Sequence, residues 1–553
     1  MGRIHLAAVG SGNGLQLLRL SPARGPLLST HLPVDWRVRF MTKIVALLLG
    51  SIGLLAALFF LMSEQPARLA DREATNSSDM PPLTFYCAAS NRAVIDAILE
   101  DYRQETGREV HIQYGPSQTL LSSLEVSQTG DLYLPADDSF LTTATTKGLV
   151  AEVLPIARMQ AVVAVRKGNP KKIKSYDDLL REDVQLVQAS VEAAAIGQLT
   201  KQVLSSADLW DRLDQATHGY RTTVTDVAND LLVGAADAGI VYDAVLATYP
   251  DLEYVSLPEL AEVNSQVSLG VLHSAADAAD ALHLARYIAA RDRGLEKYQE
   301  FGFQVADGDR WADQPELTIF AGSMLRPAIE ETIQKFEARE GVRVSRNYNG
   351  CGILVAQMQG GQHPDAYFAC DSEFMNQVVD LFPNPVPVSQ NELVILVQKG
   401  NPHRIASLRD LTRPGLRVGI GHEKQCAMGW ITQNTLKEGG IQTEVMANVT
   451  VQTPTGDMLV NQLRTGSLDA AVVYLSNAAG AGDVLDAVQI QGLACATATQ
   501  PWGVANDSKY PQTAARLFAA ICSADSQDLF ASQGFRWQLS SKSMAVAAET
   551  RSK

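Results

Sequence analysis

The segment Leu83-Thr84-Phe85-Tyr86 decides the fold, because the chain repeats it as Leu317-Thr318-Ile319-Phe320, 234 positions later (317 − 83 = 234). In both copies an amphipathic stretch, a glycine and a strand-like segment follow. A Lys-Gly-Asn-Pro turn also occurs twice, at Lys167 and at Lys399, with an offset of 232 (399 − 167 = 232). A period this long exceeds that of any solenoid repeat. The sequence therefore indicates a tandem duplication of a whole domain.

The composition is that of an ordinary globular protein. The chain has 553 residues, of which 46% are hydrophobic and 19% charged, so it is long enough for several compact domains. The net charge of −15, with no basic stripe, argues against a nucleic-acid partner. This charge also provides no overall attraction for an anionic ligand, so an anion site would have to work through local donors.

An apolar segment near the N-terminus predicts a membrane anchor. Residues 44–62 are uncharged and mostly aliphatic, and the run is near the length that crosses a bilayer. Arg37, Arg39 and Lys43 precede it, which places the N-terminus in the cytoplasm and the rest of the chain outside. The residues that follow Met62 contain no convincing cleavage site, so we favour an uncleaved anchor over a signal peptide.

Both copies alternate strand-like and helix-like segments. In the first copy an apolar run ends at Ala88, apolar residues then recur at helical spacing up to Tyr102, and Gly107 ends that helix. Val110 to Tyr114 alternates like a strand. This order predicts the α/β class, with a mostly parallel sheet covered by helices on both faces. In such sheets, ligands bind beyond the carboxyl ends of the strands.

Small polar residues follow the first two predicted strands, namely Ser90 and Ser117. Free backbone amides at a helix start point into the crevice of such a sheet, and a serine there can cap its helix. Two helix starts that face one cleft would bind an anion through neutral donors. The alternative is that both serines are ordinary helix caps.

An ordered set of motifs carries a family resemblance. The set consists of Cys87-Ala88-Ala89-Ser90, Tyr114-Gly115-Pro116-Ser117, the segment from Asp131 to Asp137, the Lys-Gly-Asn-Pro turn, and Ala238-Gly239-Ile240-Val241-Tyr242. It is similar, in order and spacing, to the periplasmic molybdate/tungstate-binding protein family, the solute-binding components of ABC importers. The resemblance occurs twice. It implies two tandem type II periplasmic-binding domains, each with two doubly wound α/β lobes and a hinge, preceded by one N-terminal transmembrane helix.

The resemblance also implies a set of site residues. In that family two serines, two backbone amides and a tyrosine hold the oxyanion, without charged side chains. For the first copy the implied ligand-binding residues are Ser90, Ser117, Ile196, Val224 and Tyr242, with Ile196 and Val224 acting through their backbone amides.

The second copy departs from the family pattern. Cys351 stands where the family has its second serine, and helix registration puts Met324 opposite Ser90. We expect one extra residue in that turn, which would make Ser323 the ligand-facing residue. The ligand-binding set expected for the second copy is Ser323, Cys351, Met428, Gly456 and Tyr474.

Sulfur-containing residues gather in the loops of the second copy. Thiolates and thioethers prefer Cu(I) and other soft metals, so a metal set of Cys351, Cys370, Cys426 and Met428 is one hypothesis, with Met324 as a further thioether. Three alternatives stay open: a disulfide, which an extracytoplasmic compartment permits, small buried hydrophobic residues, or Cys351 as a weak donor to an anion. We assign the remaining cysteines to the core: Cys87, Cys495 and Cys522.

The sequence contains no motif of a known enzyme mechanism. It has no His-Glu-x-x-His and no Cys-x-x-Cys. Asp137-Asp138 suggests acid–base chemistry, but the resemblance places this aspartate in a structural loop near the mouth of the cleft. We therefore expect neither an enzyme nor a cofactor.

The resulting expectation is an extracytoplasmic, periplasmic-face binding protein, anchored in the cytoplasmic membrane by its N-terminal helix. It would capture molybdate, tungstate or a similar oxyanion, close its lobes around it and dock on an ABC transporter permease. Two alternatives remain: a membrane-anchored ligand sensor or scaffold, and soft-metal binding by the second domain. The expected boundaries are 1–40 for a poorly structured extension, 43–62 for the membrane helix, 63–82 for a linker, 83–305 for the first domain, 306–315 for a second linker and 316–545 for the second domain.

Overall fold

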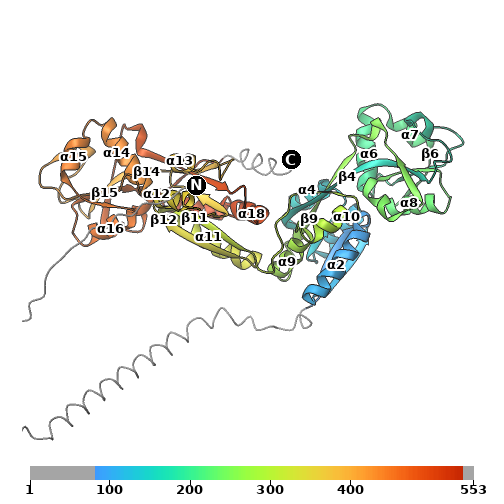
Figure 1. Cartoon of the computed structure of the whole chain (residues 1–553), viewed down its shortest axis with the longest axis horizontal. Helices are drawn as coiled ribbons and strands as arrows, with labels where there is room; N and C mark the ends of the chain where they lie inside the picture. The colour runs from blue at the N-terminus through green and yellow to red at the C-terminus, as the bar shows by residue number, and fades with distance from the viewer. Residues whose placement is uncertain (1–80, 540–553) are drawn as a thin grey trace, which may run out of the picture. The chain divides into compact units, whose positions relative to one another are not determined.

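The structure is a computed structural model that describes residues 81–539 (Figure 1). The expected extension and membrane helix, residues 1–40 and 43–62, lie outside the described residues. Within residues 81–539, no helix combines the length and the hydropathy that a bilayer span requires.

The first lobe of the first repeat is built on three parallel strands. β1 (Leu83–Ala88) lies between β2 (Val110–Gly115) and β3 (Leu132–Leu134). Helix α2 (Arg92–Thr106) connects the first two strands and buries an apolar stripe that includes Tyr102. It ends at Gly107, whose φ of 69° is the left-handed conformation that glycine adopts most easily. The predicted elements of this lobe are confirmed.

One long strand links the two lobes. β4 (Val150–Arg166) pairs with β9 (Asn264–Leu272) through residues 150–160, and then with β7 (Ala238–Tyr242) through residues 161–165. The first half of β4 thus belongs to the first lobe and the second half to the second lobe. The chain returns to the first lobe by β9, so both crossings between lobes are adjacent backbone segments, as a hinge requires.

The second lobe has its own parallel core. β5 (Leu186–Ala189) lies between β6 (Thr217–Arg221) and β7. Helix α6 (Ala195–Ser206) begins after β5, and α8 (Val224–Leu232) begins after β6. Both helices therefore start at the edge of the sheet where the parallel strands end. Figure 1 shows these elements together, apart from α2, α4 and α9 of the first lobe.

The sheets are mixed, and in this respect the expectation of a mostly parallel sheet is wrong. β9 and β4 run antiparallel to their neighbours, since the chain crosses between lobes and must come back. The remaining elements of the first repeat are η2 (Ala89–Asn91), α3 (Ser117–Ser127), α4 (Asp138–Thr146), α5 (Tyr176–Leu179), α7 (Trp210–Ala216), η3 (Asp243–Thr248), β8 (Leu252–Val255), η4 (Pro258–Leu260), α9 (Ala278–Ile288), α10 (Gly294–Glu300) and β10 (Gln304–Val305).

The second repeat follows the same path. Its strand order β12-β11-β13-β19-β14-β17-β15-β16 matches β2-β1-β3-β9-β4-β7-β5-β6 of the first repeat. Its elements are β11 (Glu316–Gly322), η5 (Ser323–Leu325), α11 (Arg326–Glu340), β12 (Arg343–Asn349), α12 (Cys351–Gln359), β13 (Ala366–Phe368), α13 (Ser372–Asn376), β14 (Val386–Gln398), η6 (Leu408–Thr412), β15 (Val418–Gly421), α14 (Ala427–Glu438), α15 (Gln442–Asn448), β16 (Val449–Thr453), α16 (Gly456–Arg464), β17 (Ala470–Tyr474), α17 (Leu475–Ala479), β18 (Leu485–Gln489), η7 (Ala494–Ala496), β19 (Thr497–Val504), α18 (Pro511–Ile521), α19 (Ala524–Ser532) and β20 (Arg536–Trp537).

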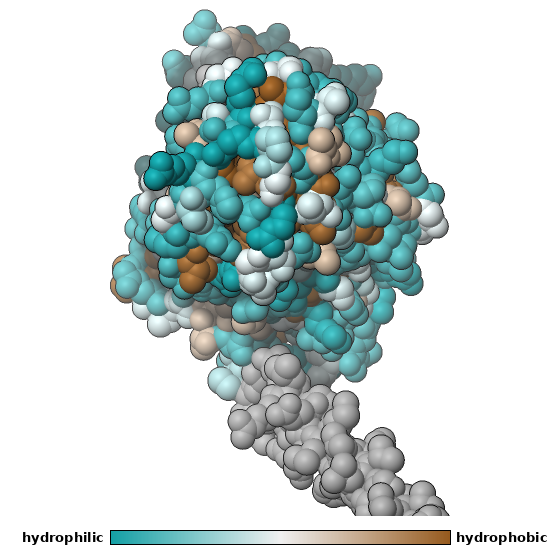
Figure 2. Space-filling model, turned by 90° about the vertical axis from the view of Figure 1, so that its left-hand side faces the viewer, coloured by the Kyte–Doolittle hydropathy of each residue, from teal (hydrophilic) through white to brown (hydrophobic). Residues whose placement is uncertain are grey.

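The surface of the second repeat is mostly hydrophilic on the face that Figure 2 shows, with hydrophobic residues in small separate spots. Beneath the surface, a continuous apolar core fills each repeat. Scattered exposed apolar residues are normal on globular proteins.

A buried ion pair lies at the C-terminal end of α11, at Glu340. Glu340 is 1% exposed and accepts two hydrogen bonds from Arg516 of α18, at 3.1 Å from Nε and 2.9 Å from Nη2. Arg286 of α9 donates to the backbone carbonyl of Glu340 and is itself buried. Burial lowers the pKa of Arg286 to about 10, while the charge of Glu340 opposes this shift. The Glu340 carboxylate therefore pairs directly with Arg516 and lies 4.0 Å from Arg286, and Asp309 adds a second negative charge near both guanidinium groups.

We predict that Glu340→Gln lowers the free energy of unfolding by about 3–5 kcal/mol, because the buried Arg516 guanidinium loses the carboxylate that it is hydrogen-bonded to. The measurement is urea unfolding of the whole chain. The matched control on the same helix is Glu331→Gln, which breaks an exposed pair with Lys335 and should cost less than about 1 kcal/mol. Equal effects of the two substitutions would contradict this assignment.

Candidate functional site

A small cavity lies between the lobes of the first repeat. Its volume is about 20 Å³, more than the roughly 10–15 Å³ that one water molecule needs. It is lined by Ala88, Ala89, Ser90, Gly115, Pro116, Ser117, Ala136, Ala194, Ala195, Ile196, Thr222, Thr223, Val224 and Tyr242. All five residues expected for the first ligand site are in this set, and none of the lining residues is charged. The structure thus brings the five together at one cavity.

Ser117 is the first residue of α3, and its side chain is held in place by the neighbouring strand. The hydroxyl oxygen accepts a hydrogen bond from the Ala136 amide at 3.0 Å, and the Ser117 carbonyl accepts one from the Tyr133 hydroxyl at 2.9 Å. Since a hydroxyl carries one hydrogen of its own, Ser117 can still donate to a ligand. The alternative that it caps its helix is wrong, because the N-cap is Pro116.

Ser90 lies within the short helix η2, at the carboxyl end of β1. Its hydroxyl accepts a hydrogen bond from Asn91 at 3.3 Å, and Asn91 is in turn held by the Tyr298 hydroxyl at 3.2 Å. The N-cap of α2 is Asn91, so Ser90 is not a helix cap either. Both serines are therefore half-satisfied hydroxyls at the cavity wall.

Two helix starts of the second lobe complete the wall. Ile196 is the second residue of α6 and Val224 the first residue of α8, where amides have no intrahelical partner. A Cβ at Gly197 would overlap the carbonyl oxygens of Ala189 and Ser190. Only glycine allows α6 to start so close to the end of β5, and this close approach aims its first turn at the cavity.

Tyr242, at the end of β7, supplies the last polar group. It is 1% exposed, and its hydroxyl has no hydrogen-bond partner of ordinary geometry. Burial raises the pKa of Tyr242 well above its usual value, against a smaller lowering effect of Ser265, so the phenol remains protonated and is a donor. A buried hydroxyl without a partner is costly, and a ligand in the cavity would satisfy it.

Thr222 and Thr223 also line the cavity, although no sequence motif singled them out as ligand-binding residues. Thr223 caps α8: its hydroxyl accepts from the Asp226 amide at 3.1 Å, and the Asp226 carboxylate accepts from the Thr223 amide at 3.1 Å. This capping box was recognisable from the Thr-x-x-Asp spacing.

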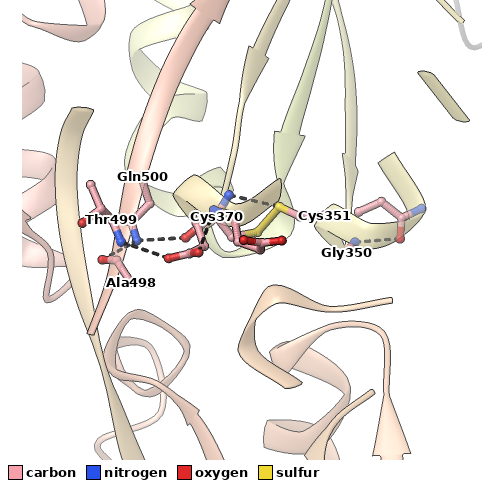
Figure 3. Close-up of a disulfide and its surroundings, with 9 residues drawn as sticks. Gly350, Cys351, Cys370, Ala498, Thr499 and Gln500 are labelled. Carbon is pink, nitrogen blue, oxygen red and sulfur yellow. Dashed lines mark hydrogen bonds between the residues drawn. A yellow bond between two sulfur atoms is a disulfide. The ribbon is translucent and has the colours of Figure 1, made fainter. Parts of the chain in front are cut away.

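In the second repeat a disulfide stands at the position of the second serine. Cys351, the first residue of α12, is bonded to Cys370 at the end of β13 (Figure 3). The Cys351 sulfur accepts a hydrogen bond from the Cys370 amide at 3.0 Å. The same bond joins Ser117 and Ala136 in the first repeat. Of the alternatives that the sequence left open for Cys351, the structure selects the disulfide.

The first turn of the second repeat differs from the expectation. η5 begins directly after β11, as η2 begins directly after β1, so the turn has no extra residue. Met324 therefore occupies the position of Ser90, and Ser323 the position of Ala89. The prediction that an insertion makes Ser323 the counterpart of Ser90 is wrong.

The other expected residues of the second site keep their positions. Met428 is the second residue of α14, Gly456 the first residue of α16, and Tyr474 the last residue of β17. Tyr474 is buried, and its hydroxyl lacks a hydrogen-bond partner, as in Tyr242. Burial raises its pKa, so it also remains a protonated donor.

The soft-metal hypothesis requires free thiolates. Cys351 and Cys370 are bonded to each other and provide none in this form. Among residues 81–539, no group of three or more His, Cys, Asp or Glu residues is placed to hold a metal ion. Metal binding through Cys351, Cys370, Cys426 and Met428 is thus not supported by this geometry. Cys87 and Cys522 are buried, as expected, whereas Cys495 is partly exposed beside Glu438, so its assignment to the core is wrong.

Both aspartates near the cleft, Asp137 and Asp138, accept hydrogen bonds from neighbouring protein groups. Asp137 is the N-cap of α4 and accepts from the Ser139 amide at 2.9 Å. Asp138 accepts from the Ser268 hydroxyl at 2.9 Å. Burial raises the pKa of Asp138 to about 6, although the hydrogen bond from Ser268 lowers it. Neither carboxylate lines the cavity.

Comparison with known proteins gives the family. The model of a family described as bacterial extracellular solute-binding protein matches residues 83–304 and again residues 317–536. The chain belongs to this family. The two matches lie within the predicted domain boundaries and cover most of the sequence. Solute-binding proteins are not enzymes, which agrees with the absence of catalytic motifs from the sequence.

Individual relatives resemble one repeat at a time. The molybdate-binding protein ModA of Mycobacterium bovis is 27% identical over 223 residues, which cover 40% of this chain and 84% of that protein. A sulfate-binding protein of Synechococcus elongatus is 25% identical over 125 residues, 20% of this chain and 36% of that protein. Among solved structures, the periplasmic molybdate-binding protein of Azotobacter vinelandii matches with a TM-score of 0.37 and 15% identity, over 41% of this chain and all of that one.

We predict that Asp138→Asn changes the pH dependence of stability. The pKa of Asp138 is raised in the folded chain from 3.8 to about 6, so the folded state binds more protons in this interval. Stability therefore falls as the pH rises from about 4 to about 6, and the lost part stays absent above it. The asparagine variant lacks this loss. Between pH 4 and pH 8, its free energy of unfolding should therefore rise by roughly 1–3 kcal/mol relative to that of the original chain. Urea unfolding at both pH values measures the difference, and a pH-independent difference would contradict it.

Proposed function

We propose that the first repeat captures a tetrahedral oxyanion, with molybdate or tungstate preferred, for an ABC-type importer. The observation that carries this proposal is the unpartnered Tyr242 hydroxyl in an uncharged cavity, together with Ser90, Ser117 and two helix starts. These groups come from both lobes, so a ligand bound to all of them would hold the lobes closed.

The donor chemistry favours a fully deprotonated anion. Each of these groups can offer a hydrogen, and no carboxylate lines the cavity to accept a proton from the ligand. Molybdate and tungstate are dianions at neutral pH and bring no proton, whereas phosphate is partly protonated. Helix N-termini provide the compensating positive potential without a charged side chain.

The size of the ligand is limited by the cavity. A volume of about 20 Å³ leaves no room for ligands of drug size, which need pockets of roughly 300–1,000 Å³, and so limits the ligand to a small group. Selection between molybdate and sulfate would depend on how well the donors reach the larger or smaller oxyanion, which changes affinity by a modest factor per contact. Similarity to both molybdate-binding and sulfate-binding relatives agrees with this class of ligand.

The family supports an extracytoplasmic location, and the apolar N-terminal segment supports a membrane tether as part of this proposal. We propose that the two domains lie on the periplasmic face, tethered by residues 43–62, and that the closed first domain docks on an ABC transporter permease. A sensor or scaffold remains the alternative if no oxyanion binds.

We predict that the double substitution Ser90→Ala with Ser117→Ala weakens molybdate binding by at least about 100-fold, because two charge-assisted hydrogen bonds are lost. Isothermal calorimetry on the whole chain with molybdate, tungstate and sulfate measures this. Ser122→Ala, on the exposed face of the same helix α3, is the matched control and should bind like the original chain. If the original chain shows no binding to any of the three oxyanions, the proposed function is overturned.

We predict a different signature for Tyr242→Phe. Affinity for the oxyanion should fall about 10-fold or more, since one donor is removed. The stability of the ligand-free chain should stay the same or rise, because a buried hydroxyl without a partner disappears. Calorimetry and thermal unfolding without ligand give the two readouts. A large loss of ligand-free stability would show that the hydroxyl has a structural partner instead.

A further inference from the structure

The two clefts share a backbone but not their polar groups. Where the first cleft has the hydroxyl of Ser90 the second has the thioether of Met324, and where the first has Ser117 the second has Cys351. Ala136 and Ala194 of the first cavity correspond to Cys370 and Cys426. Sulfur thus replaces either a donor or a methyl group at four positions of the cleft, three in the first lobe and one in the second.

The disulfide sulfur accepts the same backbone hydrogen bond as the Ser117 hydroxyl, but it cannot donate one to a ligand. In both repeats the side chain at this position accepts a hydrogen bond at 3.0 Å from the amide of the second residue after a strand, Ala136 after β3 and Cys370 after β13. A serine has a hydroxyl hydrogen left for a ligand, but a disulfide sulfur has none. The second cleft therefore lacks this donor while its loop stays in place.

Sulfur also fills the space beside the first turn. Met324 is 4% exposed and Cys351 fully buried. A Cβ at Gly322 would overlap the sulfur of Cys370, whereas the corresponding residue of the first repeat is Ala88, whose Cβ fits. The disulfide thus packs directly against the backbone at the end of β11, where the first repeat has its cavity wall.

A cysteine, Cys426, also stands at the start of helix α14 in the second lobe. Cys426 is the N-cap of α14, where α6 has Ala194, and it is buried. Burial raises the pKa of Cys426 to about 11, so its side chain stays a neutral thiol. A thiol therefore stands at this helix start where the first repeat has the methyl group of Ala194.

Carbonyl oxygens surround the turn that holds Cys351. A Cβ at Gly350 would overlap the carbonyl oxygens of Gln425 and Pro454, and a Cβ at Gly352 would overlap that of Lys424. The Gly352 amide donates to Gln425 at 3.1 Å. Pro454 replaces Thr222 and has no amide hydrogen. The first repeat has the equivalent bond, from the Gln118 amide to the Ala193 carbonyl at 3.3 Å, so the difference at this turn is the amide hydrogen that Pro454 lacks.

We propose that the second cleft excludes tetrahedral oxyanions, so that each chain binds one, and that Met324, the Cys351–Cys370 disulfide and Cys426 determine this difference. The proposal rests on oxyanion binding by the first cleft. Tyr474 and the amides of Met428 and Gly456 remain as donors in the second cleft, but the two serine hydroxyls of the first cleft have no counterpart there.

The first test is the calorimetric stoichiometry of molybdate on the whole, oxidised chain. We expect one equivalent, abolished by Ser90→Ala with Ser117→Ala and unaffected by Tyr474→Phe. Two equivalents would overturn the inference and leave the proposed function intact. A single equivalent that survives the serine substitutions and is lost in Tyr474→Phe would overturn both, and no binding at all would overturn the proposed function.

The second test rebuilds the first set of residues in the second cleft by Met324→Ser, Cys351→Ser, Cys370→Ala, Cys426→Ala and Pro454→Thr. We expect a second equivalent of molybdate, with the first site as an internal control for folding. A control with Cys351→Ala and Cys370→Ala alone should stay at one equivalent, because Met324 and Cys426 remain. A folded variant that keeps its first site and gains no second one would overturn the assignment of these residues, whereas the stoichiometry of the original chain tests the exclusion independently of this variant.

Discussion

The continuous strand that crosses between lobes is the constraint on which each site depends. β4 carries backbone hydrogen bonds of the first lobe over residues 150–160 and of the second lobe over residues 161–165, and β14 does the same in the second repeat. Each cleft therefore lies between two sheets that share a strand. Small rotations about this strand change the distance between the serine loops and the helix starts without breaking either sheet, which is the geometry of hinge closure.

The first cleft shows how a neutral site can suit an anion. Its donors are hydroxyl groups and helix N-termini, each positioned by a different strand end, and its lining has no charged side chain. A chain with a net charge of −15 gains nothing from long-range attraction, so the local arrangement of donors must supply the binding energy. The desolvated Tyr242 hydroxyl adds to this, because a ligand relieves an unsatisfied group that folding has already buried.

Duplication has preserved the backbone and changed the chemistry. The strand order of the two repeats is the same, and the amide-to-side-chain bond at Ser117 has an equivalent at Cys351. The two clefts differ in the number of hydrogen-bond donors that line them. Replacing oxygen with sulfur at the strand ends keeps the loops packed, since sulfur is apolar and adaptable, but it removes the donors. The two repeats thus keep one backbone arrangement while the polar groups of their clefts differ.

The sequence by itself determined the duplication and the α/β elements, because these follow from local hydrophobic periodicity and from motifs in a constant order. The family resemblance that those motifs carry added five of the residues that line the first cavity. Residues such as Gly107, which ends α2, signal their role locally. The tertiary structure alone decided three points. It showed mixed sheets, since antiparallel pairing of β4 and β9 depends on chain crossings. It put Met324 rather than Ser323 at the position of Ser90. It chose the disulfide among the roles open to Cys351, because bond formation with Cys370 depends on how α12 and β13 pack around β11, and no local pattern encodes that distance.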